Sequence, residues 1–180
     1  MRRLDLGCGK RKQAGSIGID RRGGTAADVI ADLDHFPYPF KDDVFTEVTA
    51  FHALEHLEDI VGVMEEIHRI SAPGALVHVR SPHYSSPASF NDPTHRHFFG
   101  AFSFDYFTDE SLYDFYTQKT FELVSRRICF SPQAQGRRFV PHRWIGVEWF
   151  ANRFPWFYEK TLAFIVTASE IEIRLRVRKS

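Results

Sequence analysis

Four points in the first third of the chain carry residues suited to hold a nucleotide-like ligand, and each follows a short apolar segment. They are the turn Gly7-Cys8-Gly9, Asp20, Asp32 and the pair Phe51-His52. Glycines in a turn let a ligand approach backbone amides without obstruction by a Cβ atom. A carboxylate at the next strand end is suited to accept the hydroxyl pair of a ribose. In this order, the four points predict a binding edge at the carboxyl ends of parallel strands.

The basic run Lys10-Arg11-Lys12 bears on the type of nucleotide. A dinucleotide fingerprint needs a third glycine and a helix N-terminus to hold the pyrophosphate, and here Lys12 occupies the third-glycine position. The stretch before Ser16 leaves no room for a long helix. The sequence therefore favours a ligand without pyrophosphate, such as the adenosyl amino acid S-adenosylmethionine (SAM), although three basic residues would also suit phosphate groups.

Short apolar segments surround one amphipathic segment, which predicts strands alternating with helices. The expected strands are residues 3–6, 16–20, 28–32, 45–51, 75–79, 121–130 and 168–179, and the expected helices are 53–70 and 109–118. The last strand alternates apolar and charged residues, so we expect it to be antiparallel or at an edge. The expected fold is α/β in a single domain over residues 1–180. It is a Rossmann-like, mostly parallel sheet with flanking helices and an antiparallel C-terminal strand.

Five stretches form a combination that is hard to obtain by chance: LDLGCG (4–9), GID (18–20), ADLDHFPYPFKDDVFTEV (31–48), FHALEHL (51–57) and EEIHRISAPGALVHVRSPH (65–83). This combination resembles the class I SAM-dependent methyltransferases of the methyltransferase type 11 kind. The resemblance implies methyl transfer from SAM to an acceptor, with SAM as the cofactor. Two departures from the family are the nine or so residues joining the first two strands and the early first strand. They suggest a loosely held cofactor or a partner subunit that covers it, as in a homodimer.

The resemblance also assigns the cofactor-binding residues. The turn of Asp5, Gly7, Cys8 and Gly9 would surround the methionine moiety, and Asp20 would bind the ribose hydroxyls. The remaining residues would contact the adenine or the sulfonium. Beside the adenine we expect Arg21, Asp32 and the backbone amide of Leu33, and around the sulfonium Phe51, His52, Ala53 and His56.

The segment from 81 to about 119 follows the fifth expected strand and is the expected substrate loop. Its candidates to orient or deprotonate the acceptor are His83, Asp92 and His95, because histidine titrates near neutrality. An Asp-Pro turn with a purely structural role is the second interpretation. The third is a metal-dependent enzyme in which Asp92, His95 and His97 bind zinc or iron. Against the metal, His95 and His97 would point to opposite sides of an extended segment.

Residues 131–160 form an aromatic and basic insertion that contains all three tryptophans. Packing of the aromatic side chains over the sheet is the simplest interpretation. The functional alternatives are a lid over the acceptor, a membrane-surface contact or a dimer interface.

Composition limits the classes of protein that remain. The 23 basic and 23 acidic residues balance, which argues against general nucleic-acid binding. No apolar run reaches the length of a membrane span, and two cysteines make no disulfide framework, so we expect a cytoplasmic protein. The expected acceptor is an O or N atom of a small or lipid-linked molecule. The competing hypothesis is a non-catalytic binding protein on a methyltransferase scaffold.

Overall fold

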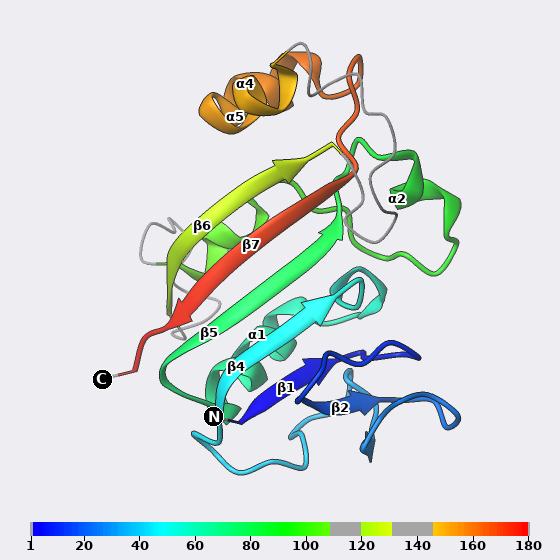
Figure 1. Ribbon diagram of the computed structural model, residues 1–180, viewed down its shortest axis with the longest axis vertical. Helices are drawn as coiled ribbons and strands as arrows, with labels where there is room; N and C mark the ends of the chain where they lie inside the picture. The colour runs from blue at the N-terminus through cyan, green and yellow to red at the C-terminus, as the bar shows by residue number, and fades with distance from the viewer. Residues whose placement is uncertain (1, 109–119, 131–145, 180) are drawn as a thin grey trace.

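The computed structural model describes residues 2–108, 120–130 and 146–179. Its strands form one seven-stranded sheet in the order β3-β2-β1-β4-β5-β7-β6 (Figure 1). The strands are β1 (Arg3–Leu6), β2 (Ile17–Asp20), β3 (Val29–Ile30), β4 (Phe45–Phe51), β5 (Ser71–Pro82), β6 (Phe121–Cys129) and β7 (Glu170–Val177). Strands β1 to β5 pair in parallel, and β7 runs antiparallel to both of its neighbours, β5 and β6. The expected α/β fold with an antiparallel C-terminal strand is therefore confirmed, with β7 inside the sheet and not at its edge.

The alternation in the last strand has the expected consequence. Ile171, Ile173 and Leu175 are fully buried, whereas Arg174 and Arg176 are exposed. One side of β7 therefore closes the main core, whereas on its other side Arg174 and Arg176 are exposed but Glu170 and Glu172 are buried.

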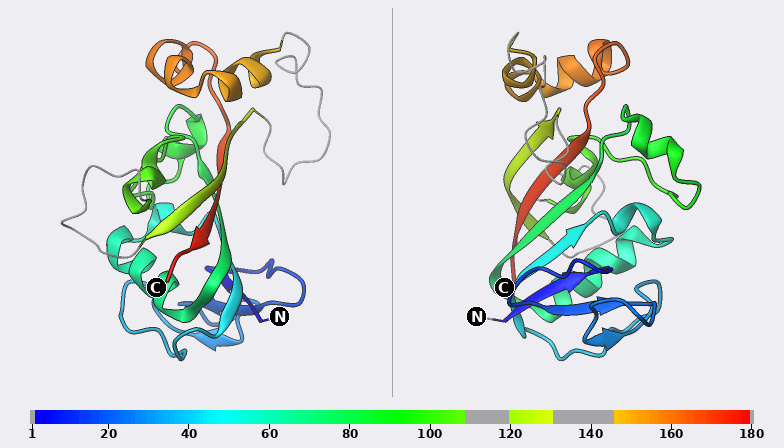
Figure 2. Two further views of the ribbon diagram at one scale, coloured as in Figure 1. Left: turned by 90° about the vertical axis from the view of Figure 1, so that its left-hand side faces the viewer. Right: turned by 45° about the vertical axis from the view of Figure 1, so that its right-hand side comes forward.

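The described helical segments lie between β4 and β5, between β5 and β6, and between β6 and β7. They are η1 (Leu54–His56), α1 (Ile60–Ile70), α2 (Pro87–Asn91), η2 (Ser103–Phe107), α4 (Val147–Arg153), α5 (Pro155–Phe157) and the π-helical turn η4 (Tyr158–Leu162). Figure 1 shows α1 behind β4 and β5, and Figure 2 shows α4 and α5 beyond the end of the sheet. None of the helices in the described parts of the chain is both long and apolar enough to cross a bilayer.

Two boundaries differ from the sequence prediction. The helix expected over 53–70 begins only at Ile60, because the side chain of Asp59 accepts the N–H of Gly62 and caps it there. The strand expected over 75–79 begins already at Ser71, which pairs with Phe45 across a register shift. The short helix expected over 109–118 lies outside the described residues.

The connections around β1, β2 and β3 contain no helix, although residues 2–44 are all described. Carboxylates hold these loops instead. Asp5 accepts the N–H of Gln13 at 2.8 Å, and Asp28 accepts the N–H of Gly18 and the Lys12 ammonium, each at 2.7 Å. The binding edge is therefore built from short loops that are tied to the strands by side-chain hydrogen bonds.

Candidate cofactor site

A cavity of about 580 Å³ lies at the carboxyl ends of β1, β2 and β4, within the size range of small-molecule sites. It is lined by Gly7, Gly9, Lys10, Asp20, Arg21, Arg22, Gly23, Gly24, Thr25, Asp32, Leu33, His52, Ala53, His56, Leu57, Asp92 and Thr94. The structure thus brings the four predicted strand-end points to a single cavity.

The backbone geometry of the turn after β1 requires glycine at two positions. Gly7 and Gly9 adopt φ values of +64° and +51°, which side-chain-bearing residues rarely adopt. A Cβ atom on Gly7 would lie 2.6 Å from the Cβ of Ala53. The turn therefore keeps a backbone surface open between β1 and β4.

The two aspartates lie at the cavity as predicted. One carboxylate oxygen of Asp20 accepts the N–H of Gly9 at 2.9 Å, and the other accepts the N–H of Arg22 at 3.0 Å. Asp32 accepts the N–H of Asp34 at 3.1 Å and keeps its other oxygen near His35. Both carboxylates are thus fixed in orientation while they remain on the cavity wall.

Three residues expected to contact the cofactor do not line the cavity. Asp5 is buried, where it accepts hydrogen bonds from the N–H of Gln13 and the hydroxyl of Thr49, and burial raises its pKa. Cys8 is also buried, and burial raises the pKa of its thiol. The ring of Phe51 lies under the guanidinium of Arg80, 4.2 Å from the ring centre. Contact of these three side chains with a cofactor stays a prediction.

His52 follows β4 in an unusual backbone conformation, with φ at +52°. Its ring nitrogens lie 3.3 Å from a carboxylate oxygen of Glu170 and 3.4 Å from one of Glu55. These two carboxylates raise the pKa of His52 to about 9. The cavity wall therefore carries an imidazolium at neutral pH, next to Ala53 and His56 as predicted.

Residues 92–97 form a loop that docks against the turn after β4. The N–H groups of Arg96 and His97 donate to the carbonyl oxygen of Glu55 at 2.7 and 3.3 Å. Asp92 accepts both the N–H and the hydroxyl of Thr94, and these hydrogen bonds lower the pKa of Asp92. Sequence reasoning missed Thr94 as a cavity residue. The docking depends on a contact between residues about 40 positions apart in the sequence.

His83 does not lie on the cavity, in contrast to the expectation that it faces the acceptor. It is fully buried, its Nδ1 accepts the N–H of Ser85 at 3.1 Å, and its Nε2 lies 3.0 Å from Glu159. Both ring nitrogens are occupied. The geometry therefore gives His83 a packing role and leaves it no ring nitrogen for an acceptor's proton.

The three residues of the metal hypothesis do not come together as a group. Nε2 of His97 points to the carbonyl oxygen of Glu58 at 3.3 Å, and Nε2 of His95 lies 3.9 Å from Asp92. His95 instead neighbours Glu55 and His56. The sequence argument that His95 and His97 point apart agrees with this arrangement.

The described part of the aromatic insertion divides into a buried and an exposed side. Tyr158 is fully buried in a small second core cluster with Phe130 and Ile128. Trp149 and Trp156 are 68% and 63% exposed. Packing therefore explains part of this segment, but not Trp149 and Trp156. Residues 131–145 lie outside the described parts of the chain.

Comparison with known proteins supports what the geometry indicates. Residues 14–79, from the loop before β2 to β5, match the family model described as "Methyltransferase domain". This segment is a little over a third of the chain, and over it the chain is similar to that family. Solved structures of SAM-dependent methyltransferases share the fold. One from Archaeoglobus fulgidus matches with 19% identity and a TM-score of 0.55, over 97% of this chain and 86% of that chain. One from Mesorhizobium loti matches with 16% identity and a TM-score of 0.51, over 97% and 90%.

The same fold also occurs in a protein named for a different reaction. The [4+2]-cyclase SpnF matches with 18% identity and a TM-score of 0.57, over 99% of this chain and 76% of that chain. No curated protein matches the sequence. Structural likeness at these identities shows the fold, and the reaction must be argued from the site.

Proposed function

We propose that the chain binds SAM in the 580 Å³ cavity and transfers its methyl group to an O or N atom of a small or lipid-linked acceptor. The observation that carries the proposal is the convergence of Gly7, Gly9, Asp20 and Asp32 on one cavity at the carboxyl ends of parallel strands. No helix follows the glycine turn, so a helix N-terminus for a pyrophosphate is lacking there.

The wall of the cavity suggests how SAM would lie. The carboxylate of Asp20 is placed to accept the ribose hydroxyls, and Asp32 with the backbone of Leu33 is placed to meet the adenine. Lys10 also lines the cavity, and its positive charge would balance the negative charge of the carboxylate of the methionine moiety. The sulfonium would then lie between the glycine turn and Ala53.

Methyl transfer is an in-line displacement, so the protein must mainly align the acceptor with the methyl carbon. The acceptor would approach from the loop 92–97, because Asp92 and Thr94 form that side of the cavity. We propose that Asp92, on the cavity wall, orients the acceptor, with His95 behind it at 3.9 Å from Asp92. Asp92 is a weak base, because its hydrogen bonds with Thr94 lower its pKa. His83 has no part in this proposal, because it is buried and both of its ring nitrogens are hydrogen-bonded.

The exposed aromatic side chains favour a lipid-linked acceptor over a small soluble one. Trp149, Trp156, Phe164 and Ile165 are each more than half exposed, and Lys160 lies 4.5 Å from the ring centre of Trp156. Aromatic side chains next to cations are typical of contacts with lipid headgroup regions. A homodimer that covers the same side chains remains the second proposal for this surface.

The test is transfer of isotopically labelled methyl groups from SAM. Two acceptor pools are offered separately: a soluble small-molecule extract and a lipid extract in vesicles. We expect label in the lipid pool, and expect it to be lost in Asp20→Ala. Label only in the soluble pool would contradict the lipid-linked acceptor. Label in neither pool, with SAM binding intact, would contradict methyl transfer.

The second candidate is a non-catalytic binding protein. It is favoured by the loops around β1 to β3, which contain no helix to cover the cavity. In that case SAM would bind and no acceptor would be methylated. The labelling experiment separates the two candidates, because binding alone is compatible with both.

A further inference from the structure

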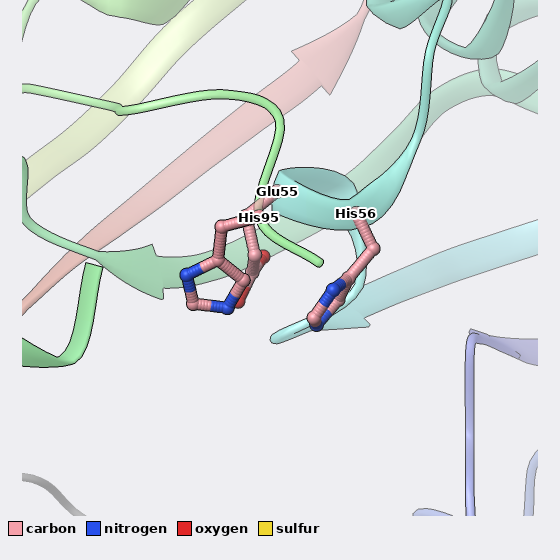
Figure 3. A group of neighbouring side chains, drawn as sticks. All are labelled: Glu55, His56 and His95. Atoms are coloured by element: carbon pink, nitrogen blue, oxygen red, sulfur yellow. The ribbon is translucent and has the colours of Figure 1, made fainter. Parts of the chain in front are cut away.

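Two histidines and a glutamate meet at the edge of the cofactor cavity. Glu55 and His56 lie on η1, directly after β4, and His95 lies on the loop 92–97 (Figure 3). One ligand-type atom of each side chain lies within 4.8 Å of the other two. The rings of His56 and His95 pack edge to face with their centres 4.7 Å apart.

The hydrogen bonds of both histidines leave the same ring nitrogen free. Thr94 donates its single hydroxyl hydrogen to Asp92 at 2.6 Å, so its oxygen must accept from Nδ1 of His56 at 2.9 Å. Nδ1 of His95 donates to the carbonyl oxygen of Ser89 at 3.0 Å. Both rings therefore keep the lone pair on Nε2. A metal-binding histidine typically donates its other N–H to an oxygen in this way.

The third side chain is a buried carboxylate with one unsatisfied oxygen. Glu55 is only 1% exposed, and its Oε2 accepts the hydroxyl of Ser81 at 2.8 Å. Its Oε1 has no hydrogen-bond partner among the described residues. His52 lies 3.4 Å from that oxygen but also contacts Glu170 at 3.3 Å. Within the described parts of the chain, Oε1 of Glu55 therefore faces only the ring of His52, which it shares with Glu170, and it keeps a lone pair that a metal ion could use.

We propose that Glu55, His56 and His95 bind a divalent transition-metal ion of the Zn²⁺ or Fe²⁺ type. Two imidazole nitrogens and one carboxylate oxygen are a donor set that both ions use in catalytic sites. Tetrahedral ligands about 2.1 Å from zinc lie about 3.4 Å apart. Binding therefore requires the ligand atoms, which lie within 4.8 Å of one another, to approach by up to about 1.4 Å. Three protein ligands leave at least one coordination position open.

The open position would face the methyl donor, because His56 lines the cofactor cavity. The catalytic role that follows for the metal ion rests on the proposed function, whereas the metal site itself does not. An acceptor hydroxyl bound to the metal has a lowered pKa and loses its proton to water. The resulting oxygen anion attacks the methyl carbon of SAM and forms the carbon–oxygen bond. The carbon–sulfur bond breaks, and its electron pair stays on sulfur as a neutral thioether. His95 then acts as a ligand and not as a base.

The test uses the full chain, without an affinity tag and stripped of metal by a chelator. Co²⁺ is titrated while its visible absorption is followed, and Zn²⁺ is then added in competition. We expect saturation near one Co²⁺ per chain and displacement by Zn²⁺. His95→Ala and Glu55→Gln should each weaken Co²⁺ binding by at least about tenfold, and Thr94→Val should weaken it less. The matched control is His97→Ala, which removes a histidine of the same loop from outside the cluster.

Equal weakening by His97→Ala, or no saturable binding, would overturn the proposal. SAM binding by the metal-free protein is measured alongside. If SAM binds and Co²⁺ does not, the metal site fails and the proposed function stands. If Co²⁺ binds and SAM does not, the proposed function fails instead. Circular dichroism of each variant, with Glu55→Gln as the near-isosteric change, separates loss of a ligand from loss of folding. Anaerobic titration with Fe²⁺ decides which ion binds more tightly.

Discussion

The loops on the two sides of β5 are held in different ways. On the β1–β4 side, carboxylates bind amides nearby in the sequence, as Asp20 binds the N–H of Gly9 eleven residues away. On the β7–β6 side, the bonds join distant segments. Glu159 accepts from the N–H of Ala101 at 2.6 Å and lies 3.0 Å from Nε2 of His83, 76 residues away. The hydrogen bonds on the β1–β4 side join residues close in sequence and hold the glycine turn of the cofactor cavity. Those on the β7–β6 side join residues far apart in sequence and hold packed segments together.

The largest expected effect comes from Gly7→Ala, on the β1–β4 side of the sheet. The new Cβ would lie 2.6 Å from that of Ala53, in a backbone conformation with φ at +64°. We expect the free energy of unfolding to fall by about 3 kcal/mol or more and SAM binding to be lost. The control is Gly74→Ala, where φ is +78° but nothing lies within 4 Å; we expect about 1–2 kcal/mol. Equal effects in chemical denaturation would show that the contact with Ala53 is unimportant.

The second prediction tests the hydrogen bonds between distant segments on the β7–β6 side. His83→Ala removes a fully buried ring and its hydrogen bonds with Ser85 and Glu159. We expect the free energy of unfolding to fall by about 2–4 kcal/mol, with unchanged affinity for SAM. His35→Ala, whose ring is 83% exposed, serves as the control for stability only, because His35 also lies 3.4 Å from Asp32 on the cavity wall. A His83→Ala protein of full stability that had lost activity would return His83 to the list of catalytic candidates.

A third substitution tests the assignment of Asp20 to the ribose hydroxyls. Asp20→Ala should weaken SAM binding about 100-fold, because hydrogen bonds to a charged group contribute about 1.5–3 kcal/mol each. Asp28→Ala is the matched control, since Asp28 also accepts a loop amide but does not line the cavity. Calorimetry measures both affinities. A dissociation constant for Asp20→Ala that equals the wild-type value would overturn the ribose assignment.

The smallest expected effect is on acid stability. Glu66 accepts from the N–H of Tyr38 at 2.7 Å and from the guanidinium of Arg69 at 2.7 Å. Burial opposes ionisation, but the hydrogen bonds with Arg69 and Tyr38 prevail and lower the pKa of Glu66 below 4.5. The stabilisation is therefore present above pH 4.5 and is lost as the pH falls through the lowered value.

The check is the melting temperature against pH for the wild type and Glu66→Gln. The difference between the two should be constant near neutrality and shrink on acidification below about 4.5. A difference that does not change between pH 6 and about 3 would contradict the pairing.

The cofactor edge could be predicted from the sequence because its features are local. Turn glycines and strand-end aspartates follow their own strands, so Gly7, Asp20 and Asp32 were placed correctly from spacing alone. The side chains of Asp5, Cys8 and Phe51 do not line the cavity, because a side chain next to a site can point away from it. Nothing in the local pattern distinguishes the two directions.

The substrate side could not be predicted in the same way. Whether His83 faces solvent depends on Glu159, and the neighbours of His95 depend on loop 92–97 docking on Glu55. The start of α1 was also missed, because Leu54 and Leu57 are buried like residues of an apolar helix face while lying outside the helix. In each case the contact that decides the outcome is set by tertiary packing.

The most direct test of the account is a calorimetric titration of the purified chain with SAM, with its demethylated product and with NADH. The account predicts micromolar binding of SAM and of the product at about one molecule per chain, and no binding of NADH. Binding of NADH alone would contradict the assignment of the cavity to an adenosyl amino acid. A folded chain that binds none of the three would contradict the proposed function.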